Sequence, residues 1–349
     1  IGIAMSGGVD SSVSASLLVA QGYEVHGFFM QLPVRSSRRN LDRAGDIADR
    51  LSIPLVAVDM TELFSGKIVD YFVRTYMRGQ TPNPCMVCNS RVKFGALMRE
   101  MRNLGMDRMA TGHYARLHRA PNGRCFLARG KDPAKDQSYF LARLTSAQLE
   151  HILFPLGGMS KKEVYERAAA LNLRGVHGPE SQDICFLAGS DLAGFFAGQG
   201  VGDQPGDIVD SRGNRLGRHR GIWRYTVGQR RGLGLPDARP WYVLRLDAGS
   251  NRVVVCRNEQ LMTGGARLSG VEWHRDAPAG PWRGSVQIRG RHRPVSALVR
   301  PAGEAAGWKI EFDREQRAVT PGQFAVFYEG DVIQGSGVIG GPVENGQEA

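Results

Sequence analysis

A glycine-rich stretch near the N-terminus has the residue types of a phosphate site. Residues 6–11 read Ser-Gly-Gly-Val-Asp-Ser, between the apolar run 3–5 and an amphipathic helical pattern. The two glycines let the backbone approach a ligand, and the first N–H groups of the helix point at it. Ser6 and Ser11 add hydroxyl donors, and Asp10 is expected to hold the Mg²⁺ that accompanies a polyphosphate. Because the lysine of a Walker A loop is missing, chemistry at the α-phosphate is favoured over γ-phosphoryl transfer.

Cysteines are the second source of chemistry. An odd count of five in 349 residues, with one Cys-x-x-Cys pair at Cys85 and Cys88, is typical of a reducing compartment where thiols act as nucleophiles or ligands. Pro82 and Pro84 predict a stiff, non-helical segment, followed by a helix that begins at or just after Cys88. Since a helix N-terminus favours negative charge, Cys88 is expected to be biased towards thiolate.

The elements that must position these groups alternate between strands and helices. Strands are predicted at residues 24–32, 54–60 and 107–114, with helical patterns between them. This alternation predicts an α/β fold with a doubly wound, Rossmann-like parallel sheet, in which ligands bind at the carboxyl ends of the strands. The glycine-rich stretch, Met30 and Gly112 all lie at such ends.

The second half of the chain has a different texture. From Gly200 onward, short apolar runs are broken by Gly, Pro, Asn and Asp, which is typical of β-barrels or small antiparallel sheets. We therefore expect three domains: a catalytic domain at residues 1–195, a small mostly β central domain at 196–265, and a C-terminal β-barrel at 266–349.

The composition points to a polyanionic partner. The formal net charge is +11 and the pI is near 9.7, which favours nucleic acid over a solvated basic surface without a partner. No stretch approaches the roughly 20 apolar residues of a membrane span, and no secretory signal is visible. We expect a soluble, cytoplasmic protein with no membrane partner.

Seven motifs together resemble the tRNA-specific 2-thiouridylase family of the N-type ATP pyrophosphatase superfamily. They stand in the family's order at residues 6–11, 81–84, 110–114, 135–139, 183–186, 225–234 and 321–323. The resemblance covers nearly the whole chain. It implies ATP-dependent 2-thiolation of the wobble uridine of certain tRNAs: O2 is adenylated, and sulfur passes from a cysteine persulfide to C2 with release of AMP and pyrophosphate.

The resemblance also implies roles for individual residues. The ATP-binding residues would be Ala4, Met5, Ser6, Gly7, Gly8, Val9, Asp10, Ser11, Met30 and Gly112. Cys88 and Cys185 would be the catalytic pair, and we hypothesise that Cys185 carries the persulfide and that a Cys88–Cys185 disulfide can close afterwards. Asn83, Pro84 and Cys85 would face the target base, while His113, Lys135, Asp136, Gln137, Arg289, Gly290 and Gln323 would touch tRNA.

The implied partners are the anticodon loop of the tRNA and a sulfur donor protein, such as a cysteine desulfurase or a sulfur relay carrier. The central domain is expected to contact tRNA. Cys85 stands where some family members carry Asp, and Gly290 replaces an aromatic residue usual beside the arginine.

A metal is an alternative use of the same thiols. Cys85, Cys88 and Cys185 could meet as three thiolates and hold an iron–sulfur cluster with one open iron. A zinc site would need a fourth ligand such as His113. Ordinary thiols without metal remain the third alternative.

Two other functions stay open at this point. One is an adenylating ligase that acts on a small molecule, against which the basic β domains and the paired cysteines argue. The other is a non-catalytic, redox-responsive RNA-binding protein in which Cys85 and Cys88 switch affinity. The intact glycine-rich stretch argues against that role.

Overall fold

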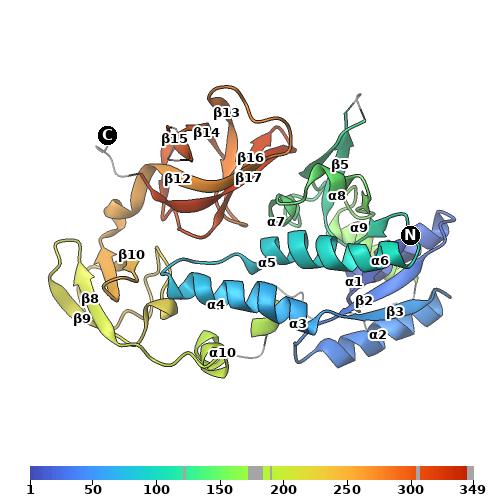
Figure 1. Ribbon diagram of the computed structural model, residues 1–349, viewed down its shortest axis with the longest axis horizontal. Coiled ribbons are helices and arrows are strands. Elements are labelled where there is room, and N and C mark those ends of the chain that lie inside the picture. Colours follow the sequence, from blue (N-terminus) through green and yellow to red (C-terminus); the bar gives the residue numbers. More distant parts are fainter. Residues whose placement is uncertain (121–122, 172–183, 189–190, 304–306, 344–349) are drawn as a thin grey trace. The chain divides into compact units, whose positions relative to one another are not determined.

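The computed structural model describes residues 1–349 except 121–122, 172–183, 189–190, 304–306 and 344–349 (Figure 1). The described chain divides into two compact units. The first comprises residues 1–69, 85–188 and 330–333, and the second comprises residues 70–84, 189–329 and 334–349. No helix among the described residues is long and apolar enough to span a bilayer.

A five-stranded parallel sheet forms the centre of the first unit. Its order is β3-β2-β1-β4-β7, with β1 (Gly2–Met5), β2 (His26–Gln31), β3 (Leu55–Asp59), β4 (Met109–Ala110) and β7 (Ile152–Leu153). The chain runs outward from β1 to β3 on one side and continues with β4 on the other, so the order reverses between β1 and β4. Ligands of such sheets bind at this reversal, beyond the carboxyl ends of the strands. The loop after β1 lies there, and the predicted α/β class is confirmed.

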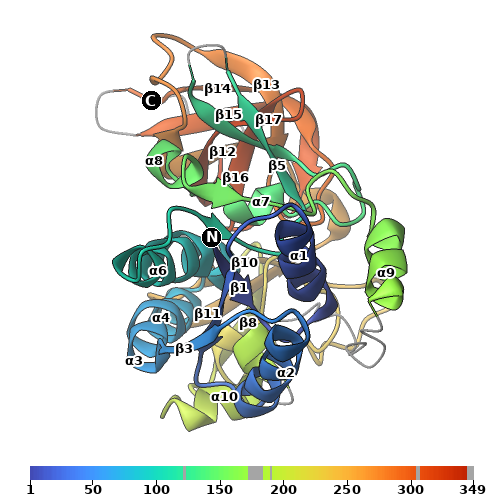
Figure 2. The same ribbon diagram turned by 90° about the vertical axis from the view of Figure 1, so that its right-hand side faces the viewer.

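Helices lie on both faces of this sheet (Figure 2). One face carries α1 (Val9–Ala20), α2 (Ser37–Arg50) and α9 (Lys161–Ala170). Their apolar residues pack with β1 in a core that includes Ile3, Val13, Leu18, Ile47 and Val164. The other face carries α6 (Met98–Asn103), which continues α5 (Pro84–Val87) and the π-helical segment η2 (Cys88–Leu97).

The helical segment that contains Cys88 begins earlier than the sequence predicts. It starts at Pro84, so the prediction of a non-helical segment up to Cys88 is wrong. Proline is favoured in the first helical turn because its φ is already helical and its missing N–H would have no partner there. Cys88 consequently lies one turn inside the segment rather than at its N-terminus.

Short elements complete the first unit. They are α3 (Thr61–Phe64), the π-helical η1 (Ser65–Val69), the hairpin of β5 (Ala115–Arg119) and β6 (Cys125–Arg129), α7 (Ser138–Leu141), α8 (Ser146–Leu149) and the 3₁₀ turn η3 (Cys185–Leu187). Residues 330–333 extend the hairpin: Val332 pairs with Ala128, and Asp331 binds Arg116 at 2.9 Å. Residues distant in the sequence therefore complete this small sheet.

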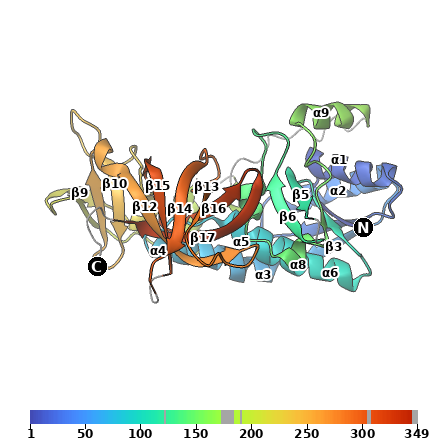
Figure 3. The same cartoon turned by 90° about the horizontal axis from the view of Figure 1, so that it is seen from above.

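The second unit is mostly β, as predicted. A four-stranded sheet has the order β10-β11-β8-β9, with β8 (Gly206–Asp210), β9 (Arg215–His219), β10 (Tyr242–Asp247) and β11 (Arg252–Cys256). A six-stranded antiparallel barrel has the order β12-β15-β14-β13-β16-β17 and closes through pairing of β12 with β17 (Figure 3). Its strands are β12 (Met262–Trp273), β13 (Trp282–Gln287), β14 (Val295–Pro301), β15 (Trp308–Arg317), β16 (Phe324–Glu329) and β17 (Val332–Pro342). The 3₁₀ turns η4 (Ile222–Arg224) and η5 (Asn258–Leu261) connect elements of this unit.

An aromatic cluster explains why residues 70–84 group with the second unit. Phe72 and Tyr76 of α4 (Asp70–Met77) contact Phe196 of α10 (Leu192–Gly198), and the ring of Phe196 stacks on Trp223 with centroids 4.5 Å apart. Aromatic rings bury large apolar areas, so this cluster is a strong reason for the grouping. The three predicted domains stay a prediction beside this two-unit division.

Candidate active site

The glycine-rich loop joins β1 to α1 in a backbone shape that needs glycine. Gly7 has φ +70°, and a Cβ there would lie 2.5 Å from the carbonyl oxygen of Asn40. The Ser11 hydroxyl accepts a hydrogen bond from the Ser6 backbone N–H and donates one to the Gly8 carbonyl. These contacts hold the loop in one shape beside the start of the helix.

The N-terminus of α1 has the features of an anion site. Its N-cap is Gly8, which has no side chain that could cap the first N–H groups of the helix. The uncapped first N–H groups and the helix dipole together favour an anion at this position. The loop geometry thus supports the predicted phosphate site.

Gly112 lies directly against this helix start. A Cβ at Gly112 would lie 2.8 Å from the Asp10 carbonyl carbon and from the Ser11 amide nitrogen. Any larger side chain would displace the loop backbone. The structure therefore brings Gly112 to the loop, although the two lie about 100 residues apart in the sequence. Met30, partly buried, lies near the carboxyl end of β2, one residue beyond the partner of Met5 at the end of β1.

Asp10 has an internal cationic partner. Lys161 Nζ lies 2.8 and 2.9 Å from its two carboxylate oxygens, and the Tyr114 hydroxyl donates to the carboxylate at 2.7 Å. These contacts do not fit Asp10 as a Mg²⁺ ligand, because the ammonium occupies the carboxylate. Lys161, the first residue of α9, thus places a lysine ammonium beside the loop.

The sequence analysis missed Lys161. Its position is set by a capping box, in which Ser160 and Glu163 exchange hydrogen bonds at the start of α9, and by its own backbone N–H, which donates to Asp132. The capping box predicts a helix start. It gives no sign that the next residue reaches a loop 150 residues away.

The three thiols of Cys85, Cys88 and Cys185 lie near enough to influence one another. Cys85 and Cys185 are exposed, and Cys88 is partly buried. Desolvation raises the pKa of all three, and that of Cys88 to about 12. The expectation that Cys88 is biased towards thiolate is wrong, because the thiol sits inside the helical segment and is shielded from water.

The metal alternatives concern the same three thiols. Among the described residues, no group of three or more His, Cys, Asp or Glu side chains is placed to hold a metal ion. The iron–sulfur cluster and the zinc site stay predictions, as do ordinary thiols without metal.

The residues expected to face the target base differ in exposure. Asn83 and Pro84 are buried, and only the Cys85 side chain is exposed. The Asn83 backbone N–H donates to the Tyr71 hydroxyl at 3.4 Å. Their predicted contact with a base stays a prediction.

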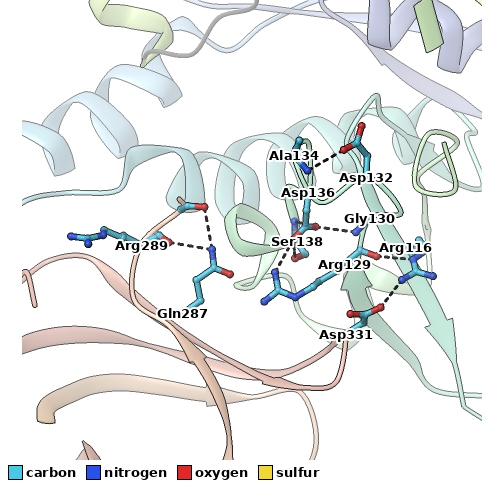
Figure 4. Close-up of polar contacts among 11 residues, drawn as sticks. Arg116, Arg129, Gly130, Asp132, Ala134, Asp136, Ser138, Gln287, Arg289 and Asp331 are labelled. Carbon is cyan, nitrogen blue, oxygen red and sulfur yellow. Dashed lines mark hydrogen bonds and ion pairs between the residues drawn. The ribbon is translucent and has the colours of Figure 1, made fainter. Parts of the chain in front are cut away.

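Two of the three residues predicted to touch tRNA at 135–137 bind their own fold. Asp136 accepts hydrogen bonds from Arg129, from the backbone of Gly130 and from both the N–H and the hydroxyl of Ser138 (Figure 4). Gln137 exchanges two 2.9 Å hydrogen bonds with the Tyr114 backbone. The side chains of Asp136 and Gln137 therefore stabilise the loop. Lys135, the third residue, is a cation and is partly buried.

In the barrel, Arg289 and Gly290 form a turn. The buried Gln287 amide donates to both of their backbone carbonyls, at 3.2 and 3.1 Å (Figure 4). The Arg289 side chain is exposed. Gln323 donates to the carbonyls of Thr81 and Pro82, both at 3.1 Å. Arg289 is therefore available to a phosphate, whereas Gln323 supports the segment before Asn83.

His113, also predicted to touch tRNA, is occupied at both ring nitrogens. Nδ1 lies 2.7 Å from the Thr111 hydroxyl and Nε2 lies 3.4 Å from Lys93 Nζ. Desolvation, together with the charge of Lys93, holds the pKa of His113 well below 6.5, so the ring is neutral.

Comparison with known proteins assigns the chain to a family. Three family models cover it in succession: the tRNA methyl transferase HUP domain at residues 1–189, the tRNA methyl transferase PRC-barrel domain at 195–257 and the aminomethyltransferase beta-barrel domain at 264–339. The tRNA-specific 2-thiouridylase MnmA of Geobacter metallireducens is 43% identical over 99% of this chain and 97% of its own. The chain belongs to the tRNA-specific 2-thiouridylase family.

Further members are equally similar along their whole length. The protein of the same name from Magnetococcus marinus is 44% identical over 97% of this chain and 98% of its own, and that from a Synechococcus strain is 45% identical over 97% and 94%. The family predicted from the seven motifs is therefore confirmed over nearly the whole chain.

Proposed function

We propose that this member of the 2-thiouridylase family converts the wobble uridine of tRNA to 2-thiouridine in an ATP-dependent reaction. Family membership makes the chain a tRNA-modifying sulfurtransferase. The observation that carries the detailed proposal is the gathering of Asp10, Ser11, Gly112 and Lys161 at the edge of the sheet where β1 and β4 diverge.

The first step activates a poor electrophile. Uridine O2 attacks the α-phosphorus of ATP, the bond to the β-phosphate oxygen breaks, and pyrophosphate leaves. The loop amides and the start of α1 receive the phosphates, and the ammonium of Lys161 neutralises the Asp10 carboxylate, which would otherwise repel them. Magnesium would enter with the nucleotide, because Asp10 is already paired.

The second step moves sulfur. A donor protein first leaves a sulfane sulfur on Cys185, whose exposure suits transfer from another protein. The terminal sulfur of this persulfide attacks C2, and the C2–O bond breaks with AMP as leaving group. The Cys88 thiolate then attacks Cys185 Sγ; the persulfide S–S bond breaks, its sulfur stays on C2, and a Cys88–Cys185 disulfide forms. A thiol reductant must reopen this disulfide before the next turnover.

The basic surface would carry the RNA. Arg289 is exposed on a turn of the barrel, and the net charge of +11 favours a polyanion. The target base must leave the anticodon stack before the enzyme can reach its C2 atom, as with other enzymes that act on bases. We infer a cytoplasmic reaction with a cysteine desulfurase or a relay carrier as sulfur donor.

Nucleoside analysis tests the proposal. Unmodified tRNA is incubated with the protein, ATP, magnesium and a persulfide donor, and the digested nucleosides are separated by mass. We expect 2-thiouridine with wild-type protein and none with Cys185→Ser or Cys88→Ser. Cys125→Ser is the matched control, because Cys125 is buried in the β5–β6 hairpin.

Pyrophosphate release separates the two steps. We expect tRNA-dependent pyrophosphate release to persist in both catalytic cysteine variants. Full thiolation by Cys185→Ser with a protein donor would contradict the assigned roles. Pyrophosphate release with a small molecule in place of tRNA would indicate an adenylating ligase.

A further inference from the structure

We propose that Lys93 supplies the positive charge that stabilises the sulfur anions of Cys88 and Cys185 during sulfur transfer, and that His113 holds the Lys93 ammonium in place. The inference deepens the proposed function and rests on the assignment of these two cysteines as the reacting groups.

Lys93 is placed by a hydrogen bond rather than by an ion pair. Its Nζ donates to His113 Nε2 at 3.4 Å, and its side chain is partly buried. None of the carboxylates in the described ranges forms an ion pair with it. Because no carboxylate among the described residues neutralises it, the charge of Lys93 is available to nearby anions.

The charge of Lys93 acts on all three thiols. It lowers the pKa of Cys85, of Cys88 and of Cys185, in each case against a larger opposing effect of desolvation. No other described cation acts on all three. Desolvation keeps the resting thiols protonated and unreactive, and Lys93 reduces the free energy needed to form the anion when it is required.

The π-helical geometry of η2 explains how Lys93 reaches Cys88. The two residues are five positions apart, which would put them on widely separated faces of an α-helix. A π-helix has i→i+5 hydrogen bonds and a wider turn, so positions i and i+5 come closer around the axis. The irregular helix thus brings the ammonium and the sulfur towards one face.

A glutamine supports this geometry. Gln148 Nε2 donates to the carbonyls of Ser90 and Phe94, at 3.1 and 2.8 Å, both inside η2. Asn89 Nδ2 donates to the Phe140 carbonyl at 2.9 Å. These hydrogen bonds satisfy two carbonyls and one side chain of η2 and stabilise its π-helical geometry.

His113 is suited to position Lys93. The neutral ring donates from Nδ1 to the Thr111 hydroxyl at 2.7 Å, which leaves the Nε2 lone pair to accept from the ammonium. Contacts with the rings of Phe94 and Phe154 fix its plane. The titratable groups that face the reacting sulfurs are therefore Cys85, Lys93 and, through Lys93, His113.

Alkylation kinetics test the inference without tRNA or ATP. Native protein is treated with iodoacetamide between pH 7 and 10, and modification of Cys88 and Cys185 is followed by peptide mass spectrometry. In Lys93→Met the alkylation profile should move up by about one pH unit, and the rate at pH 8 should fall about threefold. The fall is smaller than the tenfold loss of thiolate because a thiolate of higher pKa is the better nucleophile.

Three further variants make the result specific. Lys93→Arg keeps the charge and should stay within about twofold of wild type. Lys93→Gln keeps a hydrogen-bond donor to His113 but removes the charge, and it should slow alkylation about threefold at pH 8. It replaces Lys93→Met as the test if that variant does not fold. Lys67→Met, an exposed position in the other π-helical segment, should have no effect.

The outcomes separate this inference from the proposed function. Unchanged alkylation in folded Lys93→Gln would overturn the role of Lys93, even if thiolation is lost. Equal slowing in Lys93→Arg would also overturn it, because it would indicate packing rather than charge. If Cys185→Ser still thiolates tRNA, the cysteine assignment fails, whereas the effect of Lys93 on the thiols remains measurable.

Discussion

The ammonium of Lys161 lies 2.8 and 2.9 Å from the two carboxylate oxygens of Asp10, across 151 residues of sequence. The pair is neutral, so the loop amides and the start of α1 meet a nucleotide without the repulsion of a free carboxylate. Lys161 also packs against the Tyr114 and Tyr165 rings, which limits its movement.

Removal of this charge should impair activation of tRNA. We expect Lys161→Met to lower tRNA-dependent AMP formation about 100-fold, because Asp10 then lacks its cation and repels the phosphates; this is the scale of losing one positioned electrostatic group. Lys162→Met is the matched control, because the Lys162 side chain is exposed and pairs only weakly with Glu166. Equal losses in the two variants, measured by AMP release, would contradict the role of Lys161.

Gly112 should not tolerate a methyl group. Gly112→Ala places a Cβ 2.8 Å from loop backbone atoms, so we expect at least a tenfold weaker ATP affinity and a loss of about 1–3 kcal/mol in the free energy of unfolding. Gly45→Ala in α2 meets nothing within 4 Å and should be neutral or stabilising. Calorimetric titration and urea unfolding measure both, and unchanged ATP binding by Gly112→Ala would refute the close contact.

Gln323 should matter for stability rather than for RNA affinity. Gln323→Ala leaves the Thr81 and Pro82 carbonyls without their donor, at a cost of about 1–3 kcal/mol. Gln204→Ala, at an exposed position, should cost nothing measurable. Denaturant unfolding checks the cost. A normal unfolding curve with weakened tRNA binding would instead favour a direct contact between Gln323 and tRNA.

Arg289 should contribute one phosphate contact. We expect Arg289→Met to reduce the slope of log affinity for tRNA against log salt by about one unit. Arg283→Met should change the slope less, because Arg283 is paired with Asp313 at 2.8 Å. Filter binding from 50 to 300 mM salt measures the slopes, and a flat dependence for wild type would exclude an electrostatic RNA interface.

His113 should make stability pH-dependent. Its pKa in the folded chain lies well below 6.5, whereas the unfolded chain binds the proton near 6.5, so unfolding is favoured as the pH falls below that value. Wild-type stability should fall between pH 6.5 and 5 by up to about 1.4 kcal/mol per unit more than that of His113→Asn. The other histidines with lowered pKa, His219 and His292, are common to both proteins and cancel in the difference. Parallel curves in urea unfolding would show that His113 is not buried in this way.

Local patterns were sufficient for the fold class and for part of the site. Strand and helix periodicity predicts the parallel sheet, and the two glycines at 7 and 8 predict a loop at its edge. These predictions succeed because periodicity and glycine reflect short-range geometry, which neighbouring residues determine.

Tertiary structure alone decided the charges and the partners of the site. The Lys161–Asp10 pair, the raised pKa of Cys88 and the internal role of Gln323 all depend on residues that lie far apart in the sequence. Desolvation and ion pairing depend on what the folded chain places around a group, so a motif can name a thiol or a carboxylate without revealing its protonation or its partner.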